Sequence, residues 1–375
     1  MAFLSTLAVG CGRESESNHR ALPIGSAASG ELVPGVVVPG VEMSAARAAH
    51  TATALRDGRV LVAGGFVAEG SPIAAELYDQ DAGRRLPLPP MIATRHSHTA
   101  TELPDGRVLI VGGYASGGEP VASAELFDPK ANAFVPTGGL EQPRADHVAV
   151  LLESGQVLMV GGLGPGWEFL DSAELYDPEA GRFSPTGGMS VARESHVGVR
   201  LADGRVLVAG GHRGRRAAIV LHASAEIYDP ATGSFSAAGE MRARRHKHDG
   251  VLLADGRVLI TGGTDERDSR GIYRSTELFD PGSSRFTSGP ELVLPRYKHE
   301  GSSLLLPSGL VLIAGGAPQP EIFDPVHDRF ALVSGEVHLA GQFSAVAPLR
   351  GGGALITGGY GRDRGPQAGA WVYRI

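Results

Sequence analysis

The chain has 375 residues, of which 54 are glycine and 42% are hydrophobic, and its net charge is −7. This apolar fraction is too high, and this charge too low, for a disordered chain, and the glycines lack the every-third-residue spacing of collagen. The mildly acidic balance argues against binding of nucleic acid, and no apolar run approaches the roughly 20 residues of a membrane-spanning helix. Abundant glycine beside many apolar residues favours short strands joined by tight turns.

The N-terminal segment is apolar and ends at the only cysteine of the chain, Cys11. Residues 7–11, LAVGC, resemble the lipobox of a bacterial lipoprotein signal, which implies lipidation of Cys11 and export to the cell envelope, or secretion. We therefore expect a signal-like segment over residues 1–11 and a flexible tether over residues 12–34. The alternative is a frayed apolar end with no targeting role, because no Lys or Arg precedes Arg13.

An internal repeat dominates the rest of the sequence, where an apolar run ending in two glycines recurs seven times. The second glycines of these pairs are Gly65, Gly113, Gly162, Gly211, Gly263, Gly316 and Gly359. Each run follows a turn signal, such as Asp105-Gly106, and precedes a further apolar segment such as AELFDP. Most units end in a short segment with an aromatic residue. The pattern predicts four short antiparallel strands in each repeat of about 50 residues.

Repeats with a double glycine after the second strand and spaced aromatics beyond it resemble the kelch repeat. The resemblance implies an all-β fold, a seven-bladed kelch-type β-propeller over residues 35–375. Four-stranded antiparallel blades stack around an axis in such a fold, because a single blade cannot cover both of its faces. The recurrent Asp-Pro pairs, such as Asp128-Pro129, are expected at turns, where Asp accepts backbone hydrogen bonds and Pro fixes φ.

The two ends of the chain predict how the propeller closes. The seventh repeat stops at Ile375, after its third strand, while residues 36–43 before the first repeat align with residues 133–140, a fourth strand elsewhere. We therefore expect an N-terminal strand to complete the C-terminal blade, which removes an exposed sheet edge.

An Arg-x-x-His motif opens the first strand of six blades. Its members are Arg47/His50, Arg95/His98, Arg144/His147, Arg193/His196, Arg245/His248 and Arg296/His299. One interpretation is a cationic ring at the channel mouth that binds an anion. The other is an ion pair between each Arg and the recurrent Glu of the third strand. The seventh blade favours the second, because Trp371 replaces the Glu in the blade that also lacks the Arg.

Features found in only one or two blades are better candidates for function than features that recur. Blades 4 and 5 have the longest excursions after the double glycine, and blade 3 has a glycine-rich loop with an aromatic residue. The predicted binding residues of this rim are Arg213, Arg215, Arg216, Arg242, Arg244, Arg245, Lys247 and Trp167, and those of the ring are Arg95, Arg144, Arg193 and Arg296. The alternatives are a solvated charged face, partly neutralised by the acidic residues of 265–268, and a Trp167 ring folded back over its blade.

Metal and cofactor chemistry is not expected. The pairs His96/His98 and His246/His248 would each share one face of an extended segment, but no fixed Cys, Asp or Glu partner accompanies them. Some kelch propellers belong to copper radical oxidases similar to galactose oxidase, which need a Cys crosslinked to a ligand Tyr. Cys11 lies in the signal-like segment, so that chemistry does not carry over.

The sequence therefore predicts a monomeric, exported, non-catalytic propeller whose Arg-rich rim binds an anionic glycan, an acidic peptide or a protein surface. One alternative is an enzyme acting on a small anionic sugar or metabolite at the channel mouth, with Arg and His binding the anion and moving protons, as in a mutarotase or epimerase. Another is a purely structural surface protein. The fold does not choose among these classes.

Overall fold

A computed structural model describes residues 32–67, 75–267, 270–335, 341–361 and 365–375. Residues 33–375 form one compact unit, close to the expected propeller bounds. Cys11, the signal-like segment and nearly all of the tether lie outside the described residues. Within the described part of the chain, no helix is long and apolar enough to span a membrane.

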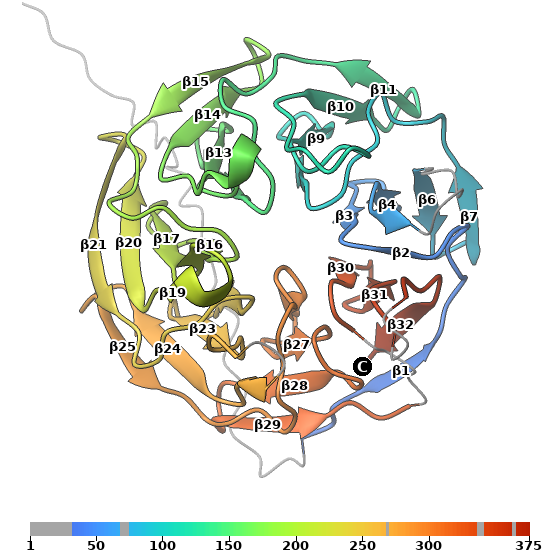
Figure 1. Cartoon of the computed structure of the whole chain (residues 1–375). Helices are drawn as coiled ribbons and strands as arrows, with labels where there is room; N and C mark the ends of the chain where they lie inside the picture. Colours follow the sequence, from blue (N-terminus) through green and yellow to red (C-terminus); the bar gives the residue numbers. More distant parts are fainter. Residues whose placement is uncertain (1–31, 68–74, 268–269, 336–340, 362–364) are drawn as a thin grey trace, which may run out of the picture. The chain divides into compact units, whose positions relative to one another are not determined.

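Seven four-stranded antiparallel sheets make up the described part of the chain, together with two small two-stranded sheets (Figure 1). Blades 1 to 3 consist of β3 (Thr51–Ala54), β4 (Val60–Ala63), β6 (Glu76–Asp79) and β7 (Arg84–Pro87); β8 (Thr99–Glu102), β9 (Val108–Val111), β10 (Ala124–Asp128) and β11 (Ala133–Pro136); and β12 (Val148–Leu151), β13 (Val157–Val160), β14 (Ala173–Asp177) and β15 (Arg182–Thr186). Blades 4 to 6 consist of β16 (Val197–Arg200), β17 (Val206–Ala209), β20 (Ser224–Asp229) and β21 (Ser234–Glu240); β22 (Asp249–Leu252), β23 (Val258–Thr261), β24 (Thr276–Asp280) and β25 (Arg285–Ser288); and β26 (Ser303–Leu305), β27 (Val311–Ile313), β28 (Glu321–Asp324) and β29 (Arg329–Leu332). The seven-bladed, all-β prediction is confirmed.

Blade 7 closes the propeller as expected. It contains β30 (Ala345–Pro348), β31 (Ala354–Thr357), β32 (Ala370–Arg374) and, on its outer edge, β1 (Val36–Pro39). β1 runs antiparallel to β32, with Val37 opposite Tyr373. The Val37 N–H also donates to the Ser334 carbonyl of blade 6, at 2.9 Å. The N-terminal strand therefore fastens the last blade to its neighbour.

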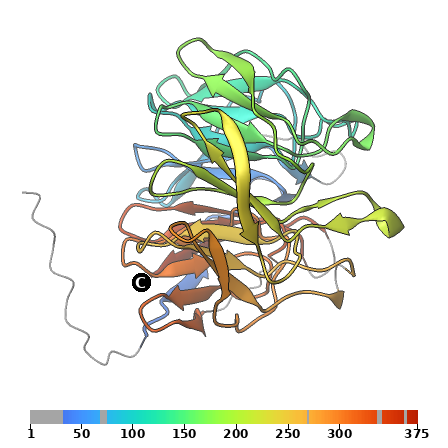
Figure 2. The same cartoon turned by 90° about the vertical axis from the view of Figure 1, so that its left-hand side faces the viewer.

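The core lies between neighbouring blades, and the second strand of each blade is fully buried. Because side chains alternate along a strand, β17 contacts both of its neighbours. Val206 and Val208 pack in a cluster with residues of blade 3, whereas Leu207 and Ala209 pack with residues of blade 5. An edge-on view shows the blades stacked face to face (Figure 2).

The double glycines allow neighbouring backbones to approach. Gly161 and Gly162 have φ of 63° and 94°. A Cβ on Gly161 would lie 2.7 Å from the Arg193 carbonyl oxygen of the next blade, and one on Gly162 would lie 2.8 Å from the Cβ of His147. The Gly162 N–H donates to the Arg193 carbonyl at 2.9 Å. A larger residue would break this link between blades 3 and 4.

Short additional elements decorate one face of the propeller. They are β2 (Arg47–Ala48) paired with β5 (Phe66–Val67), β18 (His212–Arg213) paired with β19 (Val220–Leu221), and the 3-10 helices η1 (Pro165–Trp167) and η2 (Arg216–Ala218). The β18–β19 ribbon of blade 4 projects beyond the blades (Figure 2). The long loop expected after the double glycine of blade 4 therefore lies at the rim of the propeller.

Candidate functional site

The recurrent arginines have a structural role in the blades. Their prediction as ligand-binding residues is therefore wrong. Arg95, Arg144, Arg193, Arg245 and Arg296 are at most 1% exposed, and so is Arg47. Their ion pairs are Arg47–Glu76 (3.2 Å), Arg95–Glu125 (3.1 Å), Arg144–Glu174 (2.8 Å), Arg193–Glu226 (2.9 Å), Arg245–Glu277 (2.9 Å) and Arg296–Glu321 (2.9 Å). Each guanidinium also donates to the carbonyl of the first glycine of its blade. Because these side chains are buried, a ligand in solution does not reach them.

The recurrent histidines are buried between blades and do not form a cationic ring. His147 Nε2 lies 3.0 Å from the Thr99 hydroxyl of the preceding blade, and His98 Nε2 lies 3.1 Å from that of Thr51. Burial, and then the charge of Arg144, lowers the pKa of His147 to about 3. At neutral pH such imidazoles are uncharged, so they do not attract an anion.

Residues at the third position of each Arg-x-x-His motif, and at its counterpart in blade 7, lie at the channel mouth, and those of blades 1 to 4 and 7 line the cavity there. We call these residues the mouth ring; they are Ala49, Ser97, Asp146, Ser195, Lys247, Lys298 and Phe343. All have φ between 51° and 56°. Backbone hydrogen bonds link most consecutive members; for example, Lys298 N–H donates to the Lys247 carbonyl at 2.8 Å, and Ala49 N–H donates to the Phe343 carbonyl at 3.0 Å. Only the side chains differ between blades.

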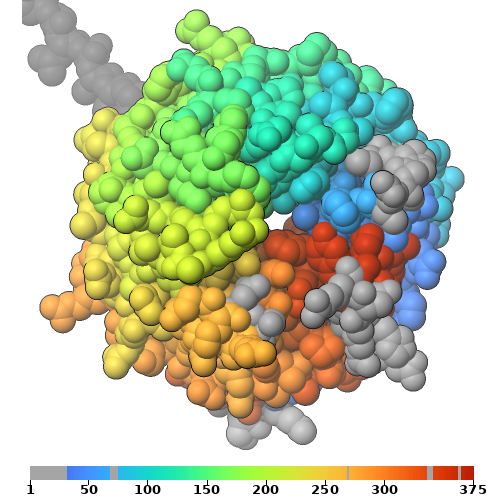
Figure 3. All heavy atoms as spheres, in the orientation of Figure 1, coloured from blue at the N-terminus to red at the C-terminus, as the bar shows by residue number. Residues whose placement is uncertain are grey.

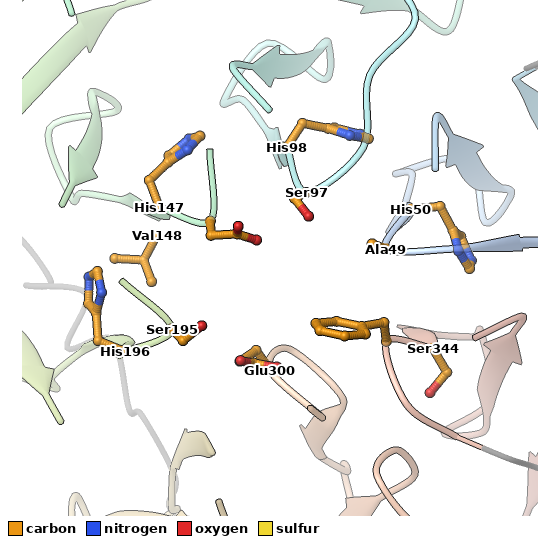
Figure 4. A pocket seen from close by; sticks show the side chains of 12 residues that line it. Ala49, His50, Ser97, His98, His147, Val148, Ser195, His196, Glu300 and Ser344 are labelled. Atoms are coloured by element: carbon orange, nitrogen blue, oxygen red, sulfur yellow. The ribbon is translucent and has the colours of Figure 1, made fainter. Parts of the chain in front are cut away.

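Two adjoining cavities lie at and below the mouth ring, with volumes of about 160 and 390 Å³. Glu300, Val148 and His196 line both. In the close-up, the Glu300 carboxylate and the Ser97 and Ser195 hydroxyls point toward the central space (Figure 4). The space-filling view shows an opening at the centre of this face (Figure 3).

The two carboxyl groups that line the smaller cavity, at the mouth ring, have raised pKa values. Burial, and then the charge of Glu194, raises the pKa of Asp146 to about 7, although Ser97 and Tyr114 hydrogen-bond to it. Burial, with smaller contributions from neighbouring carboxylates, raises the pKa of Glu300 to about 8. Both groups therefore titrate near neutral pH.

A polar chain continues from Asp146 towards blade 5. Glu194 lies near Asp146 and pairs with His212, whose Nε2 is 3.0 Å from the Glu194 carboxylate. His212 Nδ1 is 3.2 Å from Nδ1 of His246. Lys247, predicted as a rim residue, instead belongs to the mouth ring and affects the pKa of Asp146.

The outer rim carries the remaining predicted residues. Trp167 is 53% exposed, and the Arg215 guanidinium carbon lies 3.1 Å from the centre of its ring. Trp167 therefore does not fold back over its blade, contrary to that alternative. Arg213 and Arg216 are exposed beside Arg215 in the sequence.

The entry to blade 5 contributes less free positive charge. Arg242 and Arg244 are exposed, but Arg244 lies 3.5 Å from Glu266. Asp265 pairs with Arg267. The acidic loop of blade 5 thus neutralises part of this rim, as the solvated-face alternative proposed, while Asp268 and Ser269 lie outside the described residues.

The His-x-His pairs diverge, contrary to the expectation of one shared face. Ser97 has φ of 52°, which interrupts the extended backbone between His96 and His98. His96 then packs on Tyr114, with ring centres 5.2 Å apart, while His98 turns between blades toward Thr51. Among the described residues, no group of three or more His, Cys, Asp or Glu is arranged to hold a metal ion.

Comparisons with known proteins agree with this architecture. The family model of the kelch motif matches residues 195–242, which contain blade 4. A solved structure of a fungal alcohol oxidase of the AA5 family, in complex with copper, superposes with a TM-score of 0.69 at 17% identity, covering 91% of this chain and 76% of that one. A search of curated proteins found no match.

A likeness at this identity shows the fold. The chain has the fold of a seven-bladed β-propeller, and its residues 195–242 match the kelch motif. Its channel residues do not match the copper site that the resemblance implies, because the described residues include no cysteine and no metal-holding group of three or more His, Cys, Asp or Glu.

Proposed function

We propose that this propeller is a binding protein that holds an anionic ligand, an acidic peptide or protein surface or an anionic glycan, at the outer rim of blades 3 to 5. The observation that carries the proposal is the stack of Arg215 on the exposed ring of Trp167. Such a stack holds the guanidinium in place while its N–H groups remain free to bind a carboxylate or sulfate.

The surroundings of this stack support binding of an anion. Arg213 and Arg216 flank Arg215 on the same excursion and are exposed. Aromatic and Arg side chains are the residues that most often carry binding energy at interfaces. The remainder of the protein is net acidic, so a cationic rim would orient an acidic ligand during association.

Charge reversal of Arg213, Arg215, Arg216 and Arg244 to Glu is expected to abolish binding of an oligoglutamate peptide and of a heparin oligosaccharide, the two probes we would use. Binding by the unmodified protein should weaken as salt rises, because exposed charges are screened beyond about 8–10 Å at physiological ionic strength. Titration calorimetry at two salt concentrations measures both effects, and the probe that binds identifies the ligand class.

The matched control reverses four exposed arginines that begin outer strands. They are Arg84, Arg182, Arg285 and Arg329. This variant has the same net charge as the rim variant, so it should retain binding if the location of the charge matters. Equal loss in both variants, or binding that ignores salt, contradicts the proposal. Absence of binding to both probes would favour the structural surface protein.

The alternative function, an enzyme that binds a small anion through the motif Arg and His residues, is not supported, because these residues are not available to bind an anion. The motif arginines are paired and buried, and the motif histidines are uncharged at neutral pH. Among the described residues, the acidic groups that line the channel cavities are the carboxyls of Asp146, Asp249 and Glu300, and no Arg or Lys is among the lining residues. A negatively charged metabolite is therefore a poor fit to this channel.

We also propose that the protein is exported and anchored through a lipid on Cys11, as the LAVGC segment suggests. Expression in a bacterial host with labelled palmitate is expected to label the protein and to place it in the membrane fraction. The Cys11→Ser variant should lose the label and leave that fraction. An unlabelled parent protein would refute the lipid anchor.

A further inference from the structure

The channel cavity has features that the rim-binding function does not use. Its lining combines the two carboxyl groups of Asp146 and Glu300 with the hydroxyls of Ser97 and Ser195, and with the apolar surface of Phe343. Among the described residues, no Arg or Lys lines either cavity, although the mouth ring also contains Lys247 and Lys298, and Lys247 is close enough to lower the pKa of both carboxyls. The lining itself is therefore rich in hydrogen-bond acceptors.

Several buried polar atoms at this cavity lack a hydrogen-bond partner among the described residues, and they include Nδ1 of His50, His98 and His147. Glu300 Oε2 is buried and accepts no hydrogen bond, and neither ring nitrogen of His196 has a partner. His196 is only 2% exposed. The equivalent His147 bonds to Thr99, but the position that corresponds to Thr99 beside His196 is Val148. Unsatisfied buried groups are costly, at about 1–3 kcal/mol each, so a ligand or water that bonds to them would be stabilising.

Of the neighbouring carboxylates Asp249 and Glu300, only Glu300 has an oxygen that is still available to accept a hydrogen bond among the described residues. Asp249, the neighbouring carboxylate, is already satisfied by the backbone N–H groups of Gly301, Ser302 and Ser303, at 2.7–3.0 Å. Lys247 lowers the pKa of both Asp146 and Glu300, whereas the charge of Asp146 raises the pKa of Glu300. A positive charge placed between them would relieve that repulsion.

We propose that the channel cavity binds a small organic cation, with its ammonium group at Glu300, Asp146 and the free nitrogen of His196, and with its apolar part against Phe343 and Val148. This site is separate from the outer rim and takes the opposite charge. An ammonium ion has three donors and no acceptor, which matches an acceptor-lined cavity. A primary alkylammonium ion also suits the small volume of about 160 Å³ at the mouth.

The affinity of this site for an ammonium ion should increase as the pH rises. An ammonium ion binds the ionised carboxylates, and the pKa values of Asp146 and Glu300 are about 7 and about 8. Affinity should therefore increase between about pH 6 and pH 8.5 while alkylamines, which titrate near 10.4 like lysine, stay charged. The charged or titratable groups facing Asp146 are Glu194, Lys247 and Tyr114, and those facing Glu300 are Lys247, Asp146 and Asp249.

The test is saturation-transfer NMR and titration calorimetry on the full chain with methylammonium to butylammonium ions, up to about 50 mM, well above the ~1 mM of a weak site. We expect binding of at least one ammonium ion, no binding of the matching neutral alcohol, and proton release on binding below pH 8. Glu300→Gln should weaken binding at least tenfold, and Asp146→Asn should do the same.

Three controls make the result decisive. Glu179→Gln removes an exposed carboxyl in the turn after β14 and should bind like the parent protein. The rim variant Arg213→Glu/Arg216→Glu should keep ammonium binding, so failure of the rim proposal leaves this one standing. Melting curves identify any variant that fails to fold. If Glu300→Gln or Asp146→Asn does so, His196→Phe, which replaces the imidazole with a larger ring that cannot hydrogen-bond, is used instead and should also weaken binding. Equal binding of amine and alcohol, equal binding by parent and Glu300→Gln, or no binding of any amine overturns the proposal.

Discussion

Deletion of residues 31–43 should lower the melting temperature of the propeller sharply. The deletion removes β1, which pairs with β32 along its whole length, and with it Val37 and Met43, which are 1% and 4% exposed. Burial of two such side chains contributes about 3–6 kcal/mol, a large part of the about 5–15 kcal/mol that stabilises a domain. The unpaired edge of β32 would also be open to pairing with another chain.

Differential scanning fluorimetry with light scattering measures both consequences. The matched control is a deletion of the same length over residues 14–26, outside the compact unit that begins at residue 33, and it should leave the melting curve unchanged. A melting curve unaffected by loss of residues 31–43 would mean that β1 does not hold the propeller closed.

The closure was predictable because it follows from counting. Seven double glycines imply seven blades, the last repeat ends after its third strand, and residues 36–43 resemble a fourth strand. The pairing of Arg with Glu was also visible, as one of two interpretations, because blade 7 lacks both partners. Repeats provide internal comparisons of this kind, so positions that serve the fold are recognisable by their recurrence.

The channel site was not predictable to the same degree. Asp146 and Lys247 occupy a variable position inside Arg-x-x-His. The orientation of their side chains depends on a backbone φ near +50°, which the residue types found at this position do not predict. Asp, Ser, Lys and Phe all adopt it here. Glu300 follows a motif histidine, and its pKa depends on burial that only the packed blades create. The stack of Arg215 on Trp167 joins residues far apart in the sequence, for which no periodic signal exists.

Replacing Arg144 with Met should destabilise the propeller by about 3–5 kcal/mol, the usual effect of removing one partner of a buried ion pair. Arg144 is fully buried and donates to the Gly161 carbonyl, to Ser172 and to Glu174. Without it, the Glu174 carboxylate stays buried with only the N–H groups of Glu141 and Gln142. Urea unfolding followed by circular dichroism measures the change.

A second replacement, at Glu174, distinguishes two causes of the lost stability: the uncompensated charge of the Glu174 carboxylate and the lost packing of Arg144. Glu174→Gln in the Arg144→Met background removes the charge, so the double variant should be more stable than the two single effects predict, by about 0.5–3 kcal/mol. Arg213→Met, at an exposed guanidinium, should change stability by less than about 0.5 kcal/mol. If Arg144→Met were equally mild, the buried pairs would not hold the blades. Blade 7 already shows the tolerated alternative, because Gly341 and Trp371 replace both partners together.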